Sequence, residues 1–325
     1  MKYELVKLSF KTPLHLGEKE GMMEDSNFII HSDILFSAIC NSFRSLYGKR
    51  ALEELLGGFR DNNQPFLIST AFPYYKDILF FPIPMDLKPP NGDIKSFRKL
   101  RLIPKDLFEG LCKRELFKME GYAFVQDKKV LMPEKFLKDL LVEREKSYPI
   151  WDEREIQRVA LDSVTSASEI FSFREVVFKD IAGLFFLIDW KERRFENQVK
   201  AAINLLGDEG IGGDRNSGKG VFTASFGELP IVKGGGRDYL LLSLYYPDKE
   251  GIKGFDGVYD FKIRGGFVYS FDNTTRRKKY VRMFTEGSII KGREPIGSLV
   301  DVTPYGFSDH KVYRYGYAFS IPIGE

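Results

Sequence analysis

Residues Leu206–Phe222 read LGDEGIGGDRNSGKGVF and hold six glycines together with the cations Arg215 and Lys219. Glycine adopts positive φ angles without strain and lets another chain approach the backbone closely. Successive N–H groups that no side chain shields form a cradle for phosphate oxygens. The density of glycine exceeds what a turn requires, so we expect a loop that binds a phosphate backbone; a long flexible turn is the alternative. The candidate contacts are Gly210, Gly212, Gly213, Arg215, Ser217, Gly218, Lys219 and Gly220.

Part of this loop looks like a nucleotide-binding P-loop, because Gly213 and the pair Gly218-Lys219 have the spacing of a Walker A motif. The match fails at Gly220, which stands where a Ser or Thr would reach the magnesium ion. The predicted order is also reversed, since a P-loop runs from a strand into a helix. We therefore do not expect NTP hydrolysis here.

The segments around the loop alternate between strand and helix patterns. Apolar positions recur every three or four residues from Ser32-Asp33 to about Tyr47, which predicts a helix capped by Ser32 or Asp33 and followed by Gly48. A second amphipathic helix is predicted over residues 195–206, ended by Gly207. The predicted strands are residues 3–10, 182–189 and 221–226. Strand, helix, strands, helix, strand is the order of a split βαβ, or ferredoxin-like, unit.

We expect an α+β protein with two such domains. The first covers residues 1–233 and contains an insertion of short helices over about 82–150, where proline is frequent. Gly234-Gly235-Gly236 is the expected linker. The second domain, residues 237–325, is shorter and rich in strands, as a degenerate copy of the first would be. Its predicted strands are residues 238–246, 266–271, 280–284 and 313–321.

The composition excludes several classes of protein. Apolar residues make up 43% of the chain, which excludes wholesale disorder. With 2 cysteines and 3 histidines, no zinc ligand set forms at the usual spacings, and we expect no metal, cofactor or disulfide. The longest apolar run, Ile181–Ile188, is too short to span a bilayer, and residues 1–10 have the pattern of a strand rather than of a secretion signal. We expect a cytoplasmic protein that does not contact a membrane.

The formal net charge of +3 argues against a uniformly basic nucleic-acid binder. The charge is unevenly distributed, however. Residues 260–293 hold nine Lys or Arg against three Asp or Glu, and residues 95–118 hold eight against three. The rest of the chain is therefore acidic. Such a distribution is compatible with a local basic groove that binds one RNA strand, while the acidic remainder of the surface makes other contacts.

The glycine-rich loop between its predicted helix and strand resembles the signature loop of the RAMP superfamily of CRISPR-associated proteins. Residues 31–40 (HSDILFSAIC) are similar to the first-helix segment of that family, and residues 158–175 (RVALDSVTSASEIFSFRE) to its thumb hairpin. MFTEGSII at 283–290 and HKVYRYGYAF at 310–319 are similar to the fourth subunit of the type III-A Csm effector complex. The segment 82–150 carries little of the resemblance.

The resemblance implies two ferredoxin-like, RRM-related modules that bind the 5′ repeat-derived handle of the crRNA and do not cut RNA. Such subunits dock the large polymerase-like subunit and the first backbone subunit, and meet the target RNA only indirectly. The handle cradle would be residues 210–220. The thumb, about residues 158–180, would interrupt the guide–target duplex, with Phe171 or Phe173 as the wedge. RNA contacts are also expected at His31, Ser32, Arg44, Arg158 and Thr165.

A basic stretch precedes the predicted strand at 280–284. Single-stranded RNA is held by cations along its phosphates and by flat side chains on which its bases stack. The stretch supplies cations beside Tyr280 and Phe284, and Gly287-Ser288 could offer backbone N–H groups to a phosphate. A solvated hairpin and a plain turn are the alternatives. The expected contacts here are Arg276, Arg277, Lys278, Arg282, Gly287 and Ser288.

His31 and Asp33 raise the question of catalysis. Related RAMP enzymes use a histidine near the first helix as general base, so the alternative function is an endoribonuclease that processes crRNA precursors with His31. No acid–base partner is evident, and we expect a polar or RNA-stacking residue. Backbone RAMP subunits cut target RNA with an aspartate in this loop, but helix capping explains Asp33 without chemistry. Asp162 and Asp214 are expected to fix loop geometry. The 5′-capping subunit of a type III-B complex is a further alternative.

Overall fold

The computed structural model describes residues 2–16, 28–89, 94–140, 149–161, 168–253, 255–268 and 276–324. Its main sheet has nine strands in the order β11-β1-β10-β3-β4-β5-β7-β6, with β2 paired to β10. The neighbours are antiparallel except β5 and β7, which are parallel. The strands are β1 (Lys2–Phe10), β2 (Phe66–Ile68), β3 (Phe72–Tyr75), β4 (Ile78–Pro82), β5 (Leu102–Pro104), β6 (Tyr122–Val125), β7 (Val130–Pro133), β10 (Ala182–Trp190) and β11 (Phe222–Pro230).

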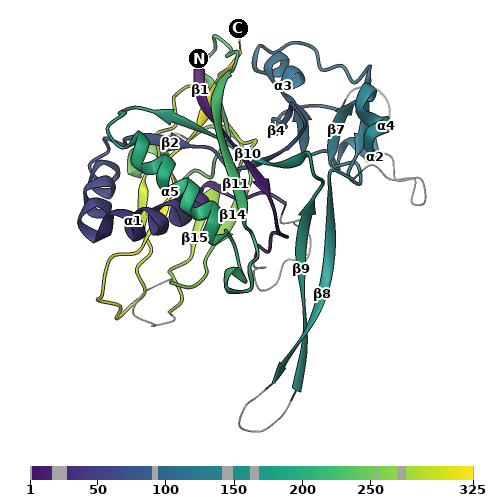
Figure 1. Cartoon of the computed structure of the whole chain (residues 1–325). Helices are drawn as coiled ribbons and strands as arrows, with labels where there is room; N and C mark the ends of the chain where they lie inside the picture. The colour runs from purple at the N-terminus through teal and green to yellow at the C-terminus, as the bar shows by residue number, and fades with distance from the viewer. Residues whose placement is uncertain are drawn as a thin grey trace.

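Two helices pack together on one side of this sheet, α1 (Ser32–Arg60) and α5 (Glu196–Glu209), as Figure 1 shows. The hydroxyl of Ser42 on α1 donates to Glu209 Oε2 at 3.2 Å. The backbone leaves the helical conformation at Gly48 (φ +80°), as predicted, but α1 continues beyond it. The other helices are α2 (Ile94–Phe97), α3 (Lys105–Cys112), α4 (Leu137–Leu140) and α6 (Lys249–Ile252), with the 3₁₀ turns η1 (Glu134–Phe136) and η2 (Arg215–Ser217).

The predicted end of the second helix at Gly207 was wrong. α5 continues to Glu209, and the N–H of Gly210 (φ +82°) donates to Leu206 O at 2.8 Å to close it. Gly207 has another role, because a Cβ there would lie 2.5 Å from the carbonyl oxygen of Phe222. This glycine lets the helix pack directly on the start of β11.

The segment 82–150 contains the short helices expected of it, but it also extends the main sheet. β5, β7 and β6 continue the sheet beyond β4, and Arg101 N–H donates to Lys129 O at 2.8 Å between two of these strands. α3 covers β4, where the rings of Phe81 and Phe108 stack with centroids 4.5 Å apart. The strands were missed because each is three or four residues long and bounded by proline or turn residues.

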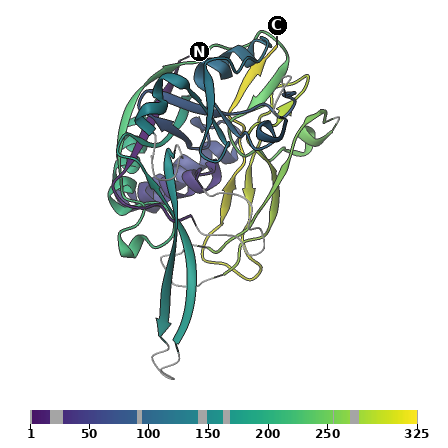
Figure 2. The ribbon, with the colours of Figure 1, turned by 90° about the vertical axis from the view of Figure 1, so that its right-hand side faces the viewer.

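A long two-stranded hairpin, β8 (Trp151–Leu161) and β9 (Ser168–Phe178), projects from the body (Figures 1 and 2). The hairpin covers the segment in which the thumb is predicted, although it begins at Trp151 rather than near Arg158. The ring of Trp151 is fully buried and stacks on Phe28, with centroids 4.6 Å apart. The base of the hairpin is thereby anchored in the core.

The C-terminal segment forms three smaller sheets. Strand order is β13-β16-β12-β19 in the largest, and the others are pairs. Of the predicted strand at 266–271, residues 269–271 lie outside the described part. The described residues 266–268 belong to no strand, and β14 lies before them. The predicted strand at 313–321 splits into β18 and β19, which join different sheets. The strands are β12 (Asp238–Leu241), β13 (Gly257–Val258), β14 (Phe261–Arg264), β15 (Val281–Phe284), β16 (Ile289–Ile290), β17 (Leu299–Asp301), β18 (Tyr313–Tyr315) and β19 (Ser320–Ile323).

The N- and C-terminal parts share one hydrophobic core. The buried ring of Tyr315 stacks on Phe36 of α1 with centroids 4.7 Å apart, and its hydroxyl accepts the N–H of Ile68 at 3.0 Å. The expected linker is itself packed, since the N–H of Gly234 donates to Pro322 O at 2.9 Å. The two parts are therefore packed against each other through a common core.

Candidate nucleic-acid interface

The glycine-rich loop leads from α5 into β11, in the helix-to-strand order that the sequence predicts. Its backbone lies against residues 13–15. The N–H of Gly213 donates to His15 O at 2.7 Å, and the N–H of Gly220 donates to Pro13 O at 2.9 Å. Ile211 N–H donates to Gly220 O at 3.0 Å and closes the loop on itself. These hydrogen bonds tie the loop to residues 13–15 and to itself, which argues against the alternative of a flexible turn.

Several glycines of the loop are required by this packing. Gly220 has φ +71°, and a Cβ there would lie 2.0 Å from the carbonyl oxygen of Ile211. Gly212 has φ +100°, and its Cβ would lie 2.3 Å from His15 O. We expected these glycines to admit an RNA backbone. In this structure their first role is to admit the protein's own backbone.

The loop is also joined to the base of the β8–β9 hairpin. Leu14 and Val176 exchange two backbone hydrogen bonds of 2.8 Å, and His15 Nδ1 shares a hydrogen bond of 2.7 Å with Arg174 O. The ammonium of Lys219 forms an ion pair with the buried carboxylate of Glu175. The interpretation of Lys219 as a phosphate ligand is therefore corrected: its charge is neutralised within the protein.

The part of the loop that faces outward is the turn at residues 214–218. Asp214 has a left-handed backbone (φ +57°), and its carbonyl oxygen accepts the N–H of Ser217 at 2.9 Å. Asp214 thus shapes the turn through its backbone, as expected of it. A cavity of about 380 Å³ opens here, lined by Gly212, Asp214, Arg215, Asn216 and Ser217. This is the position in the loop where a ligand has room.

Of the predicted thumb residues, Arg158 and Phe171 are brought together by the hairpin register, as Cα partners on adjacent strands. Phe173, the other candidate wedge, is opposite Ile156. Thr165 and Asp162 lie outside the described residues. The hairpin register therefore places the predicted cation position opposite a predicted wedge position, nearer to the far end of the hairpin than to its base.

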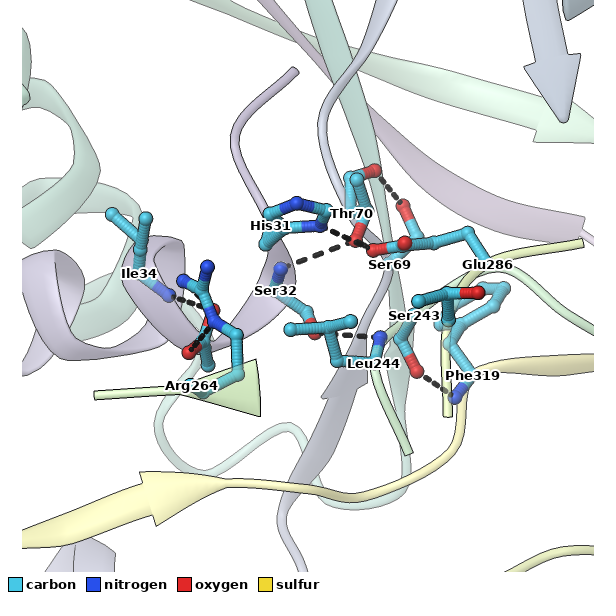
Figure 3. Close-up of polar contacts among 12 residues, drawn as sticks. His31, Ser32, Ile34, Ser69, Thr70, Ser243, Leu244, Arg264, Glu286 and Phe319 are labelled. Atoms are coloured by element: carbon cyan, nitrogen blue, oxygen red, sulfur yellow. Dashed lines mark hydrogen bonds and ion pairs between the residues drawn. The ribbon is translucent and has the colours of Figure 1, made fainter. Parts of the chain in front are cut away.

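His31 has an acid–base partner that sequence analysis missed (Figure 3). Its Nδ1 shares a hydrogen bond of 2.8 Å with Glu286 Oε1, and Thr70 donates its hydroxyl to the same oxygen. The His31 and Glu286 side chains are only 10% and 6% exposed. Burial alone would raise the pKa of Glu286, but the His31 ring and the Thr70 hydroxyl outweigh it and lower that pKa. A separation of 255 residues hid the pair from sequence analysis.

The capping prediction for Asp33 and Ser32 was wrong, because His31 occupies the N-cap position. The Asp33 carboxylate is completely buried and accepts two hydrogen bonds of 2.9 Å from Arg264 and another from Arg314. Burial alone would raise the pKa of Asp33, but the two guanidinium groups hold it well below its usual range. Ser32, fully buried, accepts the N–H of Leu244 at 3.1 Å (Figure 3).

The basic stretch at the start of β15 carries exposed arginines, which fits both the predicted RNA contact and the alternative of a solvated hairpin. Arg276 and Arg277 before the strand and Arg282 within it are exposed, and Lys278 is half-buried. Exposed rings lie among them: the guanidinium of Arg277 lies 5.4 Å from the ring centroid of Phe267. Arg44, by contrast, is half-buried on α1. The combination of cations and exposed rings has the chemistry of a single-strand binding surface.

Gly287 and Ser288 are corrected as candidates. The N–H of Gly287 donates to Leu241 O at 2.9 Å, and the N–H of Ser288 donates to Thr285 O at 3.2 Å. Both residues are buried. These N–H groups are used inside the protein, so we remove both residues from the predicted interface.

The remaining candidate segments face the same end of the molecule, opposite the two termini. Figures 1 and 2 both place the glycine-rich loop, the far end of the hairpin and the segment leading into β15 toward the lower end. Within the described residues, no three His, Cys, Asp or Glu side chains gather as a metal site. No helix in the described ranges is long and apolar enough to cross a membrane.

Two protein-family models match this chain. Residues 7–223 match the model of the RAMP superfamily, and residues 235–323 match that of the CRISPR Csm4 C-terminal domain. The chain is 29% identical over 296 residues to the CRISPR system Cms protein Csm4 of Thermococcus onnurineus (strain NA1), covering 91% of each chain. It is 26% identical over 375 residues to the Csm4 protein of Methanocaldococcus jannaschii, covering 99% of this chain and 98% of the other.

Two solved structures have a similar fold. One is a chain of a Csm3–Csm4 subcomplex of the type III-A CRISPR-Cas interference complex, with a TM-score of 0.70 and 22% identity, covering 99% of both chains. The other is a chain of a Csm1–Csm4 cassette in complex with cA4, with a TM-score of 0.65 and 24% identity, covering 99% of this chain and 98% of that one. The mixed α+β architecture with several sheets is thus that of Csm4 structures.

Proposed function

Because the chain belongs to the RAMP superfamily and has the C-terminal domain of Csm4 proteins, we propose that it is the crRNA-binding subunit of a type III-A CRISPR interference complex. In this role it caps the 5′ repeat-derived handle of the crRNA and serves antiviral defence. The strand order β11-β1-β10-β3, with α1 and α5 packed together, supports a ferredoxin-like first domain.

The observation that carries the proposal is the outward turn at 214–218. It is fixed by residues 13–15 on one side and by the hairpin base on the other. A turn held this firmly presents its backbone and Arg215 to a ligand without first having to be ordered, which favours binding. Its cavity of about 380 Å³ is shallow and polar in its lining, as suits a phosphate backbone rather than an enclosed small molecule.

The thumb carries the second part of the role. The base of the β8–β9 hairpin is anchored by the buried ring of Trp151 and by the Leu14–Val176 pairing, next to the glycine-rich loop. We propose that Phe171 or Phe173 displaces a nucleotide where handle meets guide. Contact with the target RNA is then indirect, through the interrupted guide–target duplex.

The partners that we propose are the large polymerase-like subunit and the first backbone RAMP subunit. The support is the similarity to chains from a Csm1–Csm4 cassette and a Csm3–Csm4 subcomplex, over nearly the whole length in both cases. The chain would therefore associate with Csm1 and Csm3 while holding the 5′ end of the crRNA between them.

We propose a subunit without catalytic residues. Asp33, in the loop where backbone RAMP subunits carry an aspartate, is locked between Arg264 and Arg314 and has no access to RNA. A general base must reach the proton that it abstracts. His31 is buried, with only 10% of its side chain exposed.

The second candidate function is an endoribonuclease of the same superfamily, which the His31–Glu286 pair favours because a carboxylate orients a histidine base in many enzymes. Incubation with repeat RNA in EDTA distinguishes the two functions. We expect no new 3′ end; cleavage that His31→Ala abolishes would establish the enzyme instead. The equivalent subunit of a type III-B complex has the same role, and gene neighbourhood distinguishes it.

Binding of 5′-handle RNA tests the main proposal. We expect the full chain to prefer handle RNA over a scrambled RNA of equal length, and Arg215→Ala to weaken handle binding about tenfold, the effect of losing one charge-assisted contact. Arg193→Ala is the matched control, since Arg193 is 78% exposed near the opposite end of α5. Equal binding of the two RNAs would contradict handle recognition. A substitution at Gly212 is unsuitable, because it would collide with His15.

A further inference from the structure

Two guanidinium groups meet a single carboxylate near Gly265 and Gly266. The side chains of Arg264 and Arg314, 9% and 7% exposed, both donate to Asp33. Arg314 also donates to Gly265 O at 2.6 Å, and the backbone N–H of Lys278 donates to the next carbonyl, Gly266 O, at 2.8 Å. The backbone of Lys278 is thereby anchored next to this cluster, and its ammonium is close enough to interact electrostatically with all three charges.

Within the part of the chain that the structure describes, this cluster has more positive charge than nearby carboxylates neutralise. Asp33 carries one negative charge against the three cations, and no described group accepts a hydrogen bond from the buried Nε of Arg314. Among the described residues, the Lys278 ammonium has no hydrogen-bond or ion-pair partner either. Burial and the charges of Arg314 and Arg264 lower the pKa of Lys278 to about 8, although Asp33 opposes them. A bound anion would relieve this excess, since an uncompensated buried charge is costly.

The surroundings of the cluster favour a nucleic acid as the source of that anion. The ring of Tyr280 lies on Gly265: a Cβ added to Gly265 would be 2.3 Å from Tyr280 Cε1. Tyr280 is nevertheless 60% exposed. Tyr305 is 87% exposed, and the Lys279 ammonium lies 4.8 Å from its ring centroid. Exposed rings beside cations offer stacking for bases together with charge for phosphates. A lone protein carboxylate would use only the charge.

We infer that Lys278, supported by the buried Arg264 and Arg314, binds a phosphodiester of single-stranded RNA, with Tyr280 and Tyr305 as stacking surfaces for the adjoining bases. This inference rests on the RNA-binding function proposed above and adds a contact independent of the glycine-rich loop. Lys278 is the direct ligand. Arg264 and Arg314 are positioning residues: they supply positive potential while remaining paired with Asp33.

The test is the salt dependence of RNA binding by the full chain and three variants, measured by fluorescence anisotropy. Each phosphate contact to a single strand contributes a slope of about 0.7 in log K against log salt. We expect Lys278→Gln to weaken binding about tenfold at low salt and to reduce that slope by about 0.7, for handle and scrambled RNA alike. Lys278→Arg should retain the slope. Lys291→Gln, the same charge change at a partly exposed lysine paired with Asp256, should leave it unchanged.

The outcomes separate this inference from the proposed function. An unchanged slope in Lys278→Gln, with handle preference intact, would overturn the Lys278 site alone. Loss of handle preference in the unmodified chain, with the Lys278 effect present for both RNAs, would contradict the capping role and support the site. If Lys278→Gln leaves RNA binding unchanged but abolishes co-purification with the large subunit, the anion is a protein carboxylate and the RNA inference is wrong.

Discussion

The ammonium of Lys219, in the glycine-rich loop, forms an ion pair with the buried carboxylate of Glu175, at the base of the thumb hairpin. The two residues are 44 positions apart, and their side chains are 18% and 4% exposed. The pair joins the glycine-rich loop to the base of the hairpin. The proposed handle turn and the proposed thumb are therefore linked through a buried ion pair.

Glu175→Gln should loosen this junction. The substitution leaves the largely buried ammonium of Lys219 without its counter-charge. We expect the free energy of unfolding to fall by about 2 kcal/mol. This is less than the effect of breaking a deeply buried pair, because the Lys219 side chain is still partly in contact with solvent. Urea unfolding measures the loss, and hydrogen exchange should increase at residues 212–220. Glu228→Gln is the control, since its pair with Lys2 is fully at the surface. Equal behaviour of the two variants would show that the buried pair has no special role.

Gly220→Ala should destabilise the loop more than an ordinary strand substitution does. Gly220 has a positive φ, and the added Cβ would lie 2.0 Å from Ile211 O. We therefore expect the free energy of unfolding, measured with urea, to fall by about 2 kcal/mol or more. Gly227→Ala on β11 has open space and no positive φ, so it should be neutral or slightly stabilising. A neutral Gly220→Ala would contradict the packing described for the loop.

Asp33→Asn should strongly destabilise the whole chain. It removes the only carboxylate seen to pair with Arg264 and Arg314 in the described structure, and both guanidinium groups stay buried. We expect a loss of about 3 to 5 kcal/mol in the free energy of unfolding. Asp301→Asn, at a more exposed pair with Lys311, should cost less than about 1 kcal/mol. A mild Asp33→Asn would mean that the two arginines find other acceptors.

Acid should destabilise the protein through Glu286 and Asp33, whose pKa values are both lower in the folded chain than in the unfolded one. Such carboxylates stabilise the fold above their unfolded pKa values of 4.5 and 3.8, and this stabilisation is lost as the pH falls through the folded values. Thermal unfolding from pH 6 to pH 3 should show the decline. Glu286→Gln should make the melting temperature less dependent on pH below about pH 4.5. An unchanged pH profile would exclude Glu286 as a contributor to the acid sensitivity.

The sequence pattern predicted those features that depend on local order. The main strands and both long helices follow from hydrophobic periodicity, and the glycine-rich loop was located between the elements that flank it. Local spacing also misled: Ser32 and Asp33 have the side chains of helix caps, but tertiary partners from the C-terminal segment engage both. Likewise, Gly207 was interpreted as a helix end although it is a point of close packing.

The features missed are those that depend on distant pairs. Glu286 and the partners of Asp33 lie more than 200 positions along the chain from the residues that they bind. The sequence analysis assigns Lys219 to phosphate binding from its place in the glycine-rich loop. The loop sequence does not indicate that Glu175, 44 positions away on the hairpin, pairs with this lysine. The charge of Lys219, assigned to RNA, and that of Asp33, assigned to helix capping, are both paired inside the protein. Only the folded arrangement shows these pairs.

Photo-crosslinking in the assembled complex tests the central claim most directly. The chain would be reconstituted with its large and backbone subunits and a crRNA carrying 4-thiouridine at single positions, and the crosslinked peptides identified by mass spectrometry. Handle positions should crosslink to residues 214–218, and the nucleotide at the handle–guide junction should crosslink to the thumb. Crosslinks from the 3′ end of the crRNA, or none from the handle to this chain, would contradict the capping role.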